Sequence, residues 1–163
     1  MLHRFTLFPI SIYLQEKVAP KAKTNRVKIE KTEFALPSRI ESIEEAVAKA
    51  TSTAIESGVS EDAIFGIDLA VHEAVTNAVK HGNQFDETKQ VQITFEKFPQ
   101  NFVITIKDEG SGFDLASVPD PTNPENLLKE SGRGILFMKN FMDEVSWERA
   151  PSGGTIVHLT KKF

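Results

Sequence analysis

Apolar and polar residues follow two different periods along most of this chain. Alternation typical of strands with one buried face occurs in residues 26–36, 91–98, 102–107, 144–149 and 155–160. Apolar residues at helical spacing occur in three other segments, approximately 38–57, 60–81 and 134–142. The predicted order is strand, helix, helix, strand, strand, loop, helix, strand, strand.

Local signals mark where the first two helices begin and end. Ser38 and Glu41 have the spacing of a capping box, and Gly58 predicts the end of that helix. Ser60 predicts the start of the second helix, which we expect to continue to His81. An apolar stripe on the first helix is formed by Ile40, Ile43, Val47, Ala50, Ala54 and Ile55.

The order of the elements predicts the class of fold. Strands joined by short hairpins form mostly antiparallel sheets, and helices gathered on one face would cover such a sheet. We therefore expect an α/β (α+β) two-layer sandwich, with a mostly antiparallel mixed sheet covered on one face by helices. Regular strand–helix alternation is missing, which argues against a doubly wound nucleotide-binding fold.

The first 25 residues differ from the rest, and we treat 26–163 as the folded domain. The apolar run from Phe5 to Leu14 is too short to span a membrane, which takes about 20 residues. Three interpretations of this leader remain: an export signal with a poor cleavage site, a strand that docks on the domain or a partner, and translation from an upstream start codon. Residues 115–131 contain three prolines and predict a long loop.

Composition narrows the classes of function without selecting one. The 163 residues are 40% hydrophobic and 26% charged, with no cysteine and a net charge of −4. The missing cysteines exclude disulfide scaffolds and cysteine-ligated metal sites. The acidic balance argues against a general nucleic-acid binder, which needs a basic face.

The second helix carries polar residues on an otherwise apolar segment. Glu73 and Asn77 are four residues apart and share one face, which Lys80 and His81 extend by another turn. A polar edge on such a helix is costly unless it meets water, a partner or a ligand. The simpler alternative is a Glu–Asn pair on the surface.

Two glycine-rich turns add further candidate chemistry. Asp108 is followed by Gly110 and Gly112 directly after a strand, where glycines let a ligand lie against bare backbone. Each turn also has a simpler explanation, as a plain turn or as a loop-to-helix transition that needs small residues. The second turn precedes a helix, whose unpaired N–H groups bind anions, and it contains Gly132, Arg133 and Gly134.

Together these motifs resemble a known family. Residues 26–163 are similar to the ATP-binding domain shared by gyrase-type ATPases, histidine kinases and MutL, the GHKL superfamily with its Bergerat-type fold. Within it they most resemble the bacterial anti-sigma-factor serine kinases. The resemblance is carried by residues 73–82, 108–113, 131–134, 141–145 and 153–155.

The resemblance implies a role for each motif residue. Asn77 would bind Mg²⁺ between the phosphates of ATP, and Glu73 would act as general base. Asp108 would accept a hydrogen bond from the adenine amino group, with Thr155 nearby. Gly110 and Gly112 would let the base and the sugar of ATP lie close to the backbone. Contacts with the phosphates are expected from Gly132, Arg133, Gly134, Lys80 and His81, and residues 115–131 resemble the ATP lid. His81 could equally cap its helix.

The activity implied is ATP- and Mg²⁺-dependent phosphorylation of a serine on an anti-anti-sigma protein of the STAS fold. The implied second partner is a sigma factor held inactive, and the implied assembly is a cytoplasmic homodimer without direct nucleic-acid or membrane contact. Two alternatives remain: a non-catalytic module that binds ATP or a partner, and a stand-alone kinase domain of another signalling pathway. Glu73 favours the enzyme, because an ATP-binding switch would not need that carboxylate.

Overall fold

The computed structural model describes residues 30–112 and 133–162. No helix within these two ranges is long and apolar enough to cross a membrane. The elements, in chain order, are β1 (Glu30–Pro37), α1 (Glu41–Glu56), α2 (Glu61–Asn77), the π-helical turn η1 (Ala78–Gly82), β2 (Gln90–Phe98), β3 (Asn101–Lys107), α3 (Arg133–Phe141), β4 (Glu144–Arg149) and β5 (Thr155–Lys162).

Three predictions concern residues outside the described ranges. They are the apolar leader, the loop at 115–131, and the phosphate contact assigned to Gly132. The division of the chain into a leader of 25 residues and a domain from residue 26 therefore remains a proposal.

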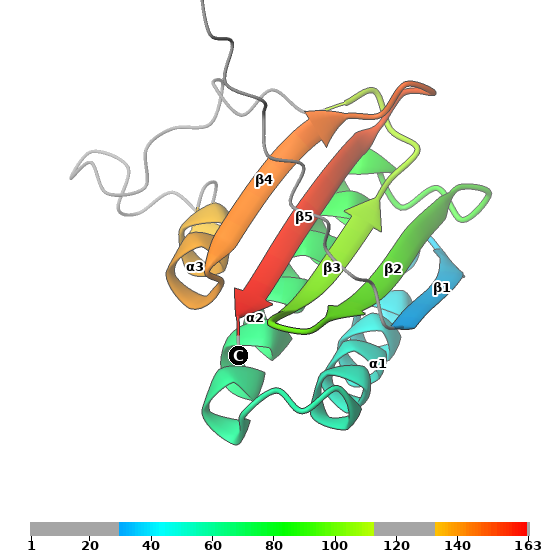
Figure 1. Cartoon of the computed structure of the whole chain (residues 1–163). Helices are drawn as coiled ribbons and strands as arrows, with labels where there is room; N and C mark the ends of the chain where they lie inside the picture. The colour runs from blue at the N-terminus through cyan, green and yellow to red at the C-terminus, as the bar shows by residue number, and fades with distance from the viewer. Residues whose placement is uncertain (1–29, 113–132, 163) are drawn as a thin grey trace, which may run out of the picture.

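One sheet contains all the described strands, in the order β1-β2-β3-β5-β4. Each neighbouring pair is antiparallel. Figure 1 shows α1, α2 and α3 together on one face of the sheet, behind the strands in that view. The predicted two-layer sandwich is thus confirmed, and across the described strands the sheet is antiparallel throughout.

The position of β5 between β3 and β4 brings two distant segments together. Lys107 at the end of β3 pairs with Ile156 near the start of β5. Asp108 therefore emerges beside Thr155, although the two are 47 residues apart in the chain. These residues, at the end of β3 and the start of β5, form one end of the candidate site.

The hydrophobic core fills the space between the sheet and its helical layer. Phe95 of β2 and Phe102 of β3 are almost fully buried, with ring centroids 5.9 Å apart. Ala46, Ala50 and Ala54 recur every four residues on α1 and are completely buried. Their small side chains let α1 pack closely on its neighbours.

The apolar stripe predicted on the first helix is only partly correct. Ile43, Ala50 and Ala54 are buried, but Ile40 and Ile55 are 66% and 57% exposed. Ile40 precedes α1 as its N-cap residue, and Ile55 lies in its last turn. Helical spacing identifies one side of a helix, but it does not show how far the covering layer extends.

The predicted capping box at the start of the first helix is wrong. The N-cap residue is Ile40, and Ser38 Oγ is buried without a hydrogen-bond partner in the described part of the chain. The N–H of Ser38 donates to the carbonyl of Lys89 at 3.1 Å, which ties Ser38 to the segment before β2. The side-chain bond that connects this helix to the preceding strand comes from Ser42, whose hydroxyl donates to the carbonyl of Pro37 at 2.6 Å.

The helix ends differ in how well the sequence predicts them. Gly58 has a φ of +88°, as expected for a glycine that terminates a helix, and Ser60 precedes α2 as predicted. However, α2 ends at Asn77, and the predicted continuation to His81 is the wider turn η1. The N–H of Asn83 donates to the carbonyl of Ala78 at 2.8 Å, five residues back, which defines a π turn.

Candidate active site

Asp108 is the buried centre of the first glycine turn, with 4% of its surface exposed. Its Oδ1 atom accepts hydrogen bonds from the N–H groups of Gly110 at 2.8 Å and Thr155 at 3.1 Å. The Asp108 N–H in turn donates to the Thr155 carbonyl at 3.1 Å. Both side-chain bonds use Oδ1, and Oδ2 has no hydrogen bond to the described residues.

Three glycines surround Asp108 so closely that no side chain would fit. A Cβ atom on Gly82 or Gly154 would come within 3.0 Å of Asp108, and one on Gly110 would meet the Gly82 carbonyl. Gly154 also has a φ of +87°, a conformation that other residues adopt only with strain. The glycine backbone therefore packs directly on and around this buried residue.

Substitution of Gly154 by alanine is expected to destabilise the fold around Asp108. The matched control is Gly58→Ala, because Gly58 has a φ of +88° but nothing within 4 Å of its added Cβ. Gly58→Ala should cost about 1–2 kcal/mol of unfolding free energy from the left-handed backbone alone. Gly154→Ala should cost more, because its Cβ meets the fixed Asp108 carbonyl. Urea denaturation measures both variants, and equal costs would contradict this packing.

Glu73 on α2 lies against the start of α3. A Cβ atom on Gly134 would clash with Glu73 Oε2, so the glycine leaves room for this carboxylate. The Glu73 side chain is 26% exposed, with the imidazole Nδ1 of His72 3.8 Å from its Oε1. The structure therefore brings together the first and third sequence motifs, which are 61 residues apart.

One continuous helical segment connects the two ends of the candidate site. Glu73 lies beside Gly134, half-buried Asn77 follows one turn later, and Gly82 at the end of η1 packs on Asp108. Glu73 and Gly82 are nine residues apart, or roughly 13 Å at 1.5 Å per helical residue. The second and third motifs therefore both contact the helical segment that carries the first.

Lys80 and His81 occupy the π turn with exposed side chains. Their predicted place on the face of Glu73 and Asn77 assumed α-helical spacing, which ends at Asn77. Single π turns inside helices are frequent at functional sites. Both residues directly precede Gly82, and their contact with a ligand remains a prediction.

The other predicted residues surround the same region from β5, α3 and the first glycine turn. Thr155 is buried and bonded to Asp108, whereas Arg133 is exposed as the first residue of α3. Gly112 has a φ of +92° and lies against the side chain of Arg149. Arg149 Nη2 donates to the Ser111 carbonyl at 3.0 Å and holds the outer side of the turn.

Sequence reasoning missed a second set of polar residues next to Asp108. Asn83 is completely buried and links the residue after Asp108, Glu109, to the start of β2 at Gln90. The sequence offered one signal for it, a polar residue directly after Gly82 at the end of a core helix. Its side-chain partners come from two other segments, which is why the local pattern did not reveal it.

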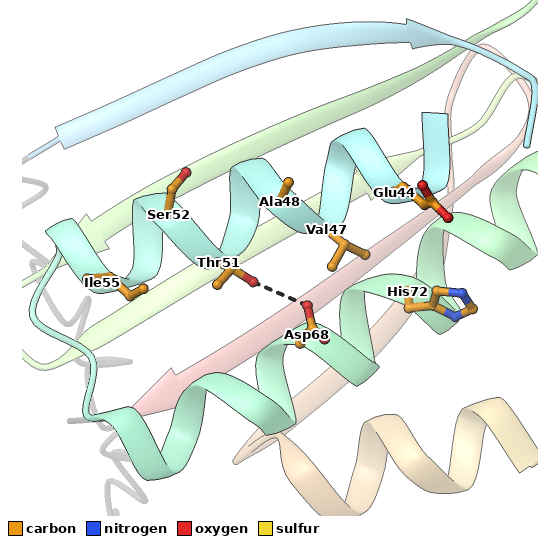
Figure 2. A pocket seen from close by; sticks show the side chains of 8 residues that line it. All are labelled: Glu44, Val47, Ala48, Thr51, Ser52, Ile55, Asp68 and His72. Carbon is orange, nitrogen blue, oxygen red and sulfur yellow. Dashed lines mark hydrogen bonds between the residues drawn. The ribbon is translucent and has the colours of Figure 1, made fainter. Parts of the chain in front are cut away.

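A groove between α1 and α2 lies apart from these residues (Figure 2). Thr51 Oγ1 donates to Asp68 Oδ1 across it at 3.3 Å. His72 lines the groove, whereas the next residue, Glu73, packs beside Gly134 of α3. None of the predicted site residues lines it. The lining residues are Glu44, Val47, Ala48, Thr51, Ser52, Ile55, Asp68 and His72.

Comparison with known proteins identifies related sequences over the same residues. Residues 36–161 match the family model of the histidine kinase-like ATPase domain. The chain is 40% identical over 104 residues to the anti-sigma F factor of Bacillus licheniformis, which covers 61% of this chain and 70% of that protein. The anti-sigma F factor of Bacillus subtilis (strain 168) matches with the same identity and coverage.

A serine kinase and a solved structure are also similar. The serine-protein kinase RsbW of Bacillus licheniformis is 35% identical over 114 residues, covering 66% of this chain and 70% of that protein. The structure of the RsbU and RsbW domains of Rv1364c from Mycobacterium tuberculosis shares the fold, with a TM-score of 0.58 at 19% identity, covering 82% of this chain and 32% of that chain. This chain therefore belongs to the histidine kinase-like ATPase domain family, in the group that contains the anti-sigma F factors and the serine-protein kinase RsbW.

Proposed function

We propose that this chain is an anti-sigma factor with serine protein kinase activity. In this function it transfers the γ-phosphoryl group of ATP to a serine of a STAS-type anti-anti-sigma protein and sequesters a sigma factor. The observation that carries the proposal is the continuous segment of α2 and η1, which contacts Gly134 through Glu73 and Asp108 through Gly82. The names of the similar proteins, anti-sigma F factor and serine-protein kinase, support it.

The Asp108 end of the site suits adenine. A carboxylate oxygen that is not already bonded can accept from the exocyclic amine of the base, and Oδ2 is in that position. Gly82, Gly110 and Gly154 pack tightly on and around Asp108, which holds its carboxylate in place for the base. We assign base recognition to Asp108 and Thr155, and close contact with base and sugar to Gly110 and Gly112.

The start of α3 suits phosphate. The first N–H groups of a helix have no partner inside the helix and carry partial positive charge, which favours anions. Arg133 adds a permanent positive charge at the first position of α3, and Gly134 lets the Glu73 carboxylate lie against the start of this helix. We assign phosphate contacts to Gly132, Arg133 and Gly134, with Lys80 and His81 approaching from η1.

Asn77 fits a Mg²⁺ site that is shared with the nucleotide. Among the described residues, no group of three or more His, Cys, Asp or Glu could hold a metal ion by itself. Mg²⁺ prefers oxygen ligands and is usually bound through one or two protein groups together with substrate phosphates and waters. The half-buried Asn77 carboxamide, one helical turn from Glu73, provides such an oxygen. When bound, Mg²⁺ would neutralise phosphate charge.

Glu73 is the proposed general base. The acceptor serine oxygen forms a bond to the γ-phosphorus while the bond from that phosphorus to the bridging oxygen breaks and ADP leaves. The proton of the serine hydroxyl passes to the Glu73 carboxylate, which lies where α2 meets α3. Positioning and charge neutralisation provide most of the catalysis in such transfers.

Partner and assembly assignments extend this proposal. We propose a cytoplasmic homodimer that binds protein regulators rather than nucleic acid, in keeping with a net charge of −4. Light scattering on the full chain tests the dimer, and a monomeric mass would remove it.

Incubation of the full chain with Mg²⁺, radiolabelled ATP and candidate STAS proteins tests the function. The expected result is Mg²⁺-dependent label on a serine of one of these proteins. Pull-down with mass spectrometry, in ATP and in ADP, should capture a sigma factor. A chain that binds no nucleotide in Mg²⁺ would overturn the site, whereas one that binds ATP without labelling any protein would support the non-catalytic alternative.

A further inference from the structure

We propose that Asn83 is a positioning residue that fixes the turn after β3 and thereby sets the preference of the site for adenine over guanine. This inference rests on the proposed function, because it assumes that Asp108 reads the base. Asn83 itself is completely buried and lies behind the turn, so it acts through the backbone that carries Asp108.

Three consecutive backbone N–H groups of this turn donate to fixed acceptors. The N–H of Asp108 donates to the Thr155 carbonyl at 3.1 Å, and that of Gly110 to Asp108 Oδ1 at 2.8 Å. The N–H between them, from Glu109, donates to Asn83 Oδ1 at 2.8 Å. Asn83 thus supplies the central anchor of the turn, from a different part of the chain.

The Asn83 carboxamide is itself held in a closed ring of three hydrogen bonds. Its Nδ2 donates to the Gln90 carbonyl at 3.0 Å, and the Gln90 N–H donates to Glu109 Oε2 at 2.8 Å. With the bond from the Glu109 N–H to Asn83 Oδ1, the ring connects η1, β2 and the turn. Such a ring fixes the orientation of the carboxamide, because both of its ends have partners.

The backbone after Asn83 adopts a costly conformation to reach this position. Gln84 and Phe85 have φ values of +58° and +57°, which is uncommon for residues other than glycine. The Phe85 side chain is 47% exposed, so its burial does not explain the conformation. Strained residues of this kind persist where the surrounding structure holds them in place. Here the bonds of Asn83 hold the segment against β2 and the turn.

The ring matters for specificity because a rigid carboxylate discriminates between purines. Adenine presents a donating amine where guanine presents an accepting carbonyl oxygen. With Oδ1 occupied by two N–H groups, Asp108 has Oδ2 left for the base, and a fixed Oδ2 repels the guanine oxygen. Loss of the bond from the Glu109 N–H to Asn83 would let the turn rotate. Asp108 Oδ2 would then be held less firmly, so the site would discriminate less between adenine and guanine.

Affinities of the full chain for ATP and GTP, measured by calorimetry in Mg²⁺ for wild type and variants, test this inference. Asn83→Ala is expected to lower the ratio of ATP to GTP affinity at least about tenfold, which corresponds to 1.4 kcal/mol. Glu109→Ala removes only the bond from the Gln90 N–H to the Glu109 carboxylate. Because the Glu109 side chain is exposed, this variant should fold, and it should lower the ratio of ATP to GTP affinity by a smaller factor. Amide exchange at Glu109 and Gly110, without nucleotide, should quicken in both variants.

Thr88→Ala is the matched control, because it removes the hydroxyl that donates to Asp86 Oδ1 at 2.6 Å in the same loop without touching the turn. Its affinity ratio should stay within about twofold of wild type, as for a typical surface substitution. A ratio unchanged in Asn83→Ala and Glu109→Ala, with only the unfolding temperature lowered, would overturn the inference. A wild-type chain that binds no nucleotide would instead overturn the proposed function, and this inference with it.

Discussion

Glu73→Gln is expected to reduce phosphoryl transfer by about 10²–10⁴-fold, the usual contribution of a general base. Glutamine has the same shape, so it preserves the packing against Gly134 while it removes the group that takes up the serine proton. ATP affinity should be equal to or higher than in wild type, because a negative charge near the phosphates is lost. Single-turnover labelling of the acceptor protein and calorimetry with ATP measure the two effects separately.

Glu44→Gln provides the control for this variant. Glu44 is an exposed carboxylate of α1 that lines the groove on the other side of α2, so labelling should stay at the wild-type rate. If Glu73→Gln labels the acceptor as fast as wild type does, the general-base role is wrong. A parallel loss of ATP affinity and rate would instead indicate that Glu73 only supports the phosphate end of the site.

Asn77→Ala is expected to weaken the binding of ATP in Mg²⁺ by at least about 10–100-fold, a loss typical of altered metal sites. Binding measured in EDTA should change much less, because Asn77 acts through the metal and not on the base. The dissociation constants for ATP in Mg²⁺ and in EDTA therefore become more nearly equal. Asn77→Asp keeps an oxygen ligand and should retain most of the Mg²⁺ effect.

Asn101→Ala is a suitable comparison, because Asn101 begins β3 and Asp108 follows the end of that strand. The two residues are at opposite ends of the strand, so this variant should bind ATP as wild type does in both solutions. Equal losses with and without Mg²⁺ in Asn77→Ala would count against a metal role. Asn77 would then have a packing role at the junction of α2 and η1.

The secondary structure was largely predictable because its signals are local. Alternation along the strands and helical spacing in residues 60–77 reflect which side of each element is buried. The polarity of each residue indicates whether its position is buried or exposed. The order of elements then favoured an antiparallel sheet covered on one face. Three short motifs suggested the ATP-binding family, and the match of residues 36–161 to the histidine kinase-like ATPase domain confirms it.

Other predictions failed where a tertiary contact outweighed a local preference. Ser38 and Glu41 have capping-box spacing, but Ser38 is held by the Lys89 carbonyl and the helix begins after Ile40. Ile55 has the spacing of a core residue, yet it is 57% exposed at the end of α1. The second helix widens into η1, because its end must meet β2 and the turn at Asp108.

The sequence by itself determined the elements, the fold class, the family and the identity of the candidate site residues, because each depends on residue type and spacing along the chain. Only the tertiary structure decided that Gly134 meets Glu73, that Gly82 and Gly154 enclose Asp108, and that Asn83 anchors Glu109. These contacts join residues from different helices, strands and turns. The contact of Gly154 with Asp108 further depends on how β5 inserts between β3 and β4, which no local pattern encodes.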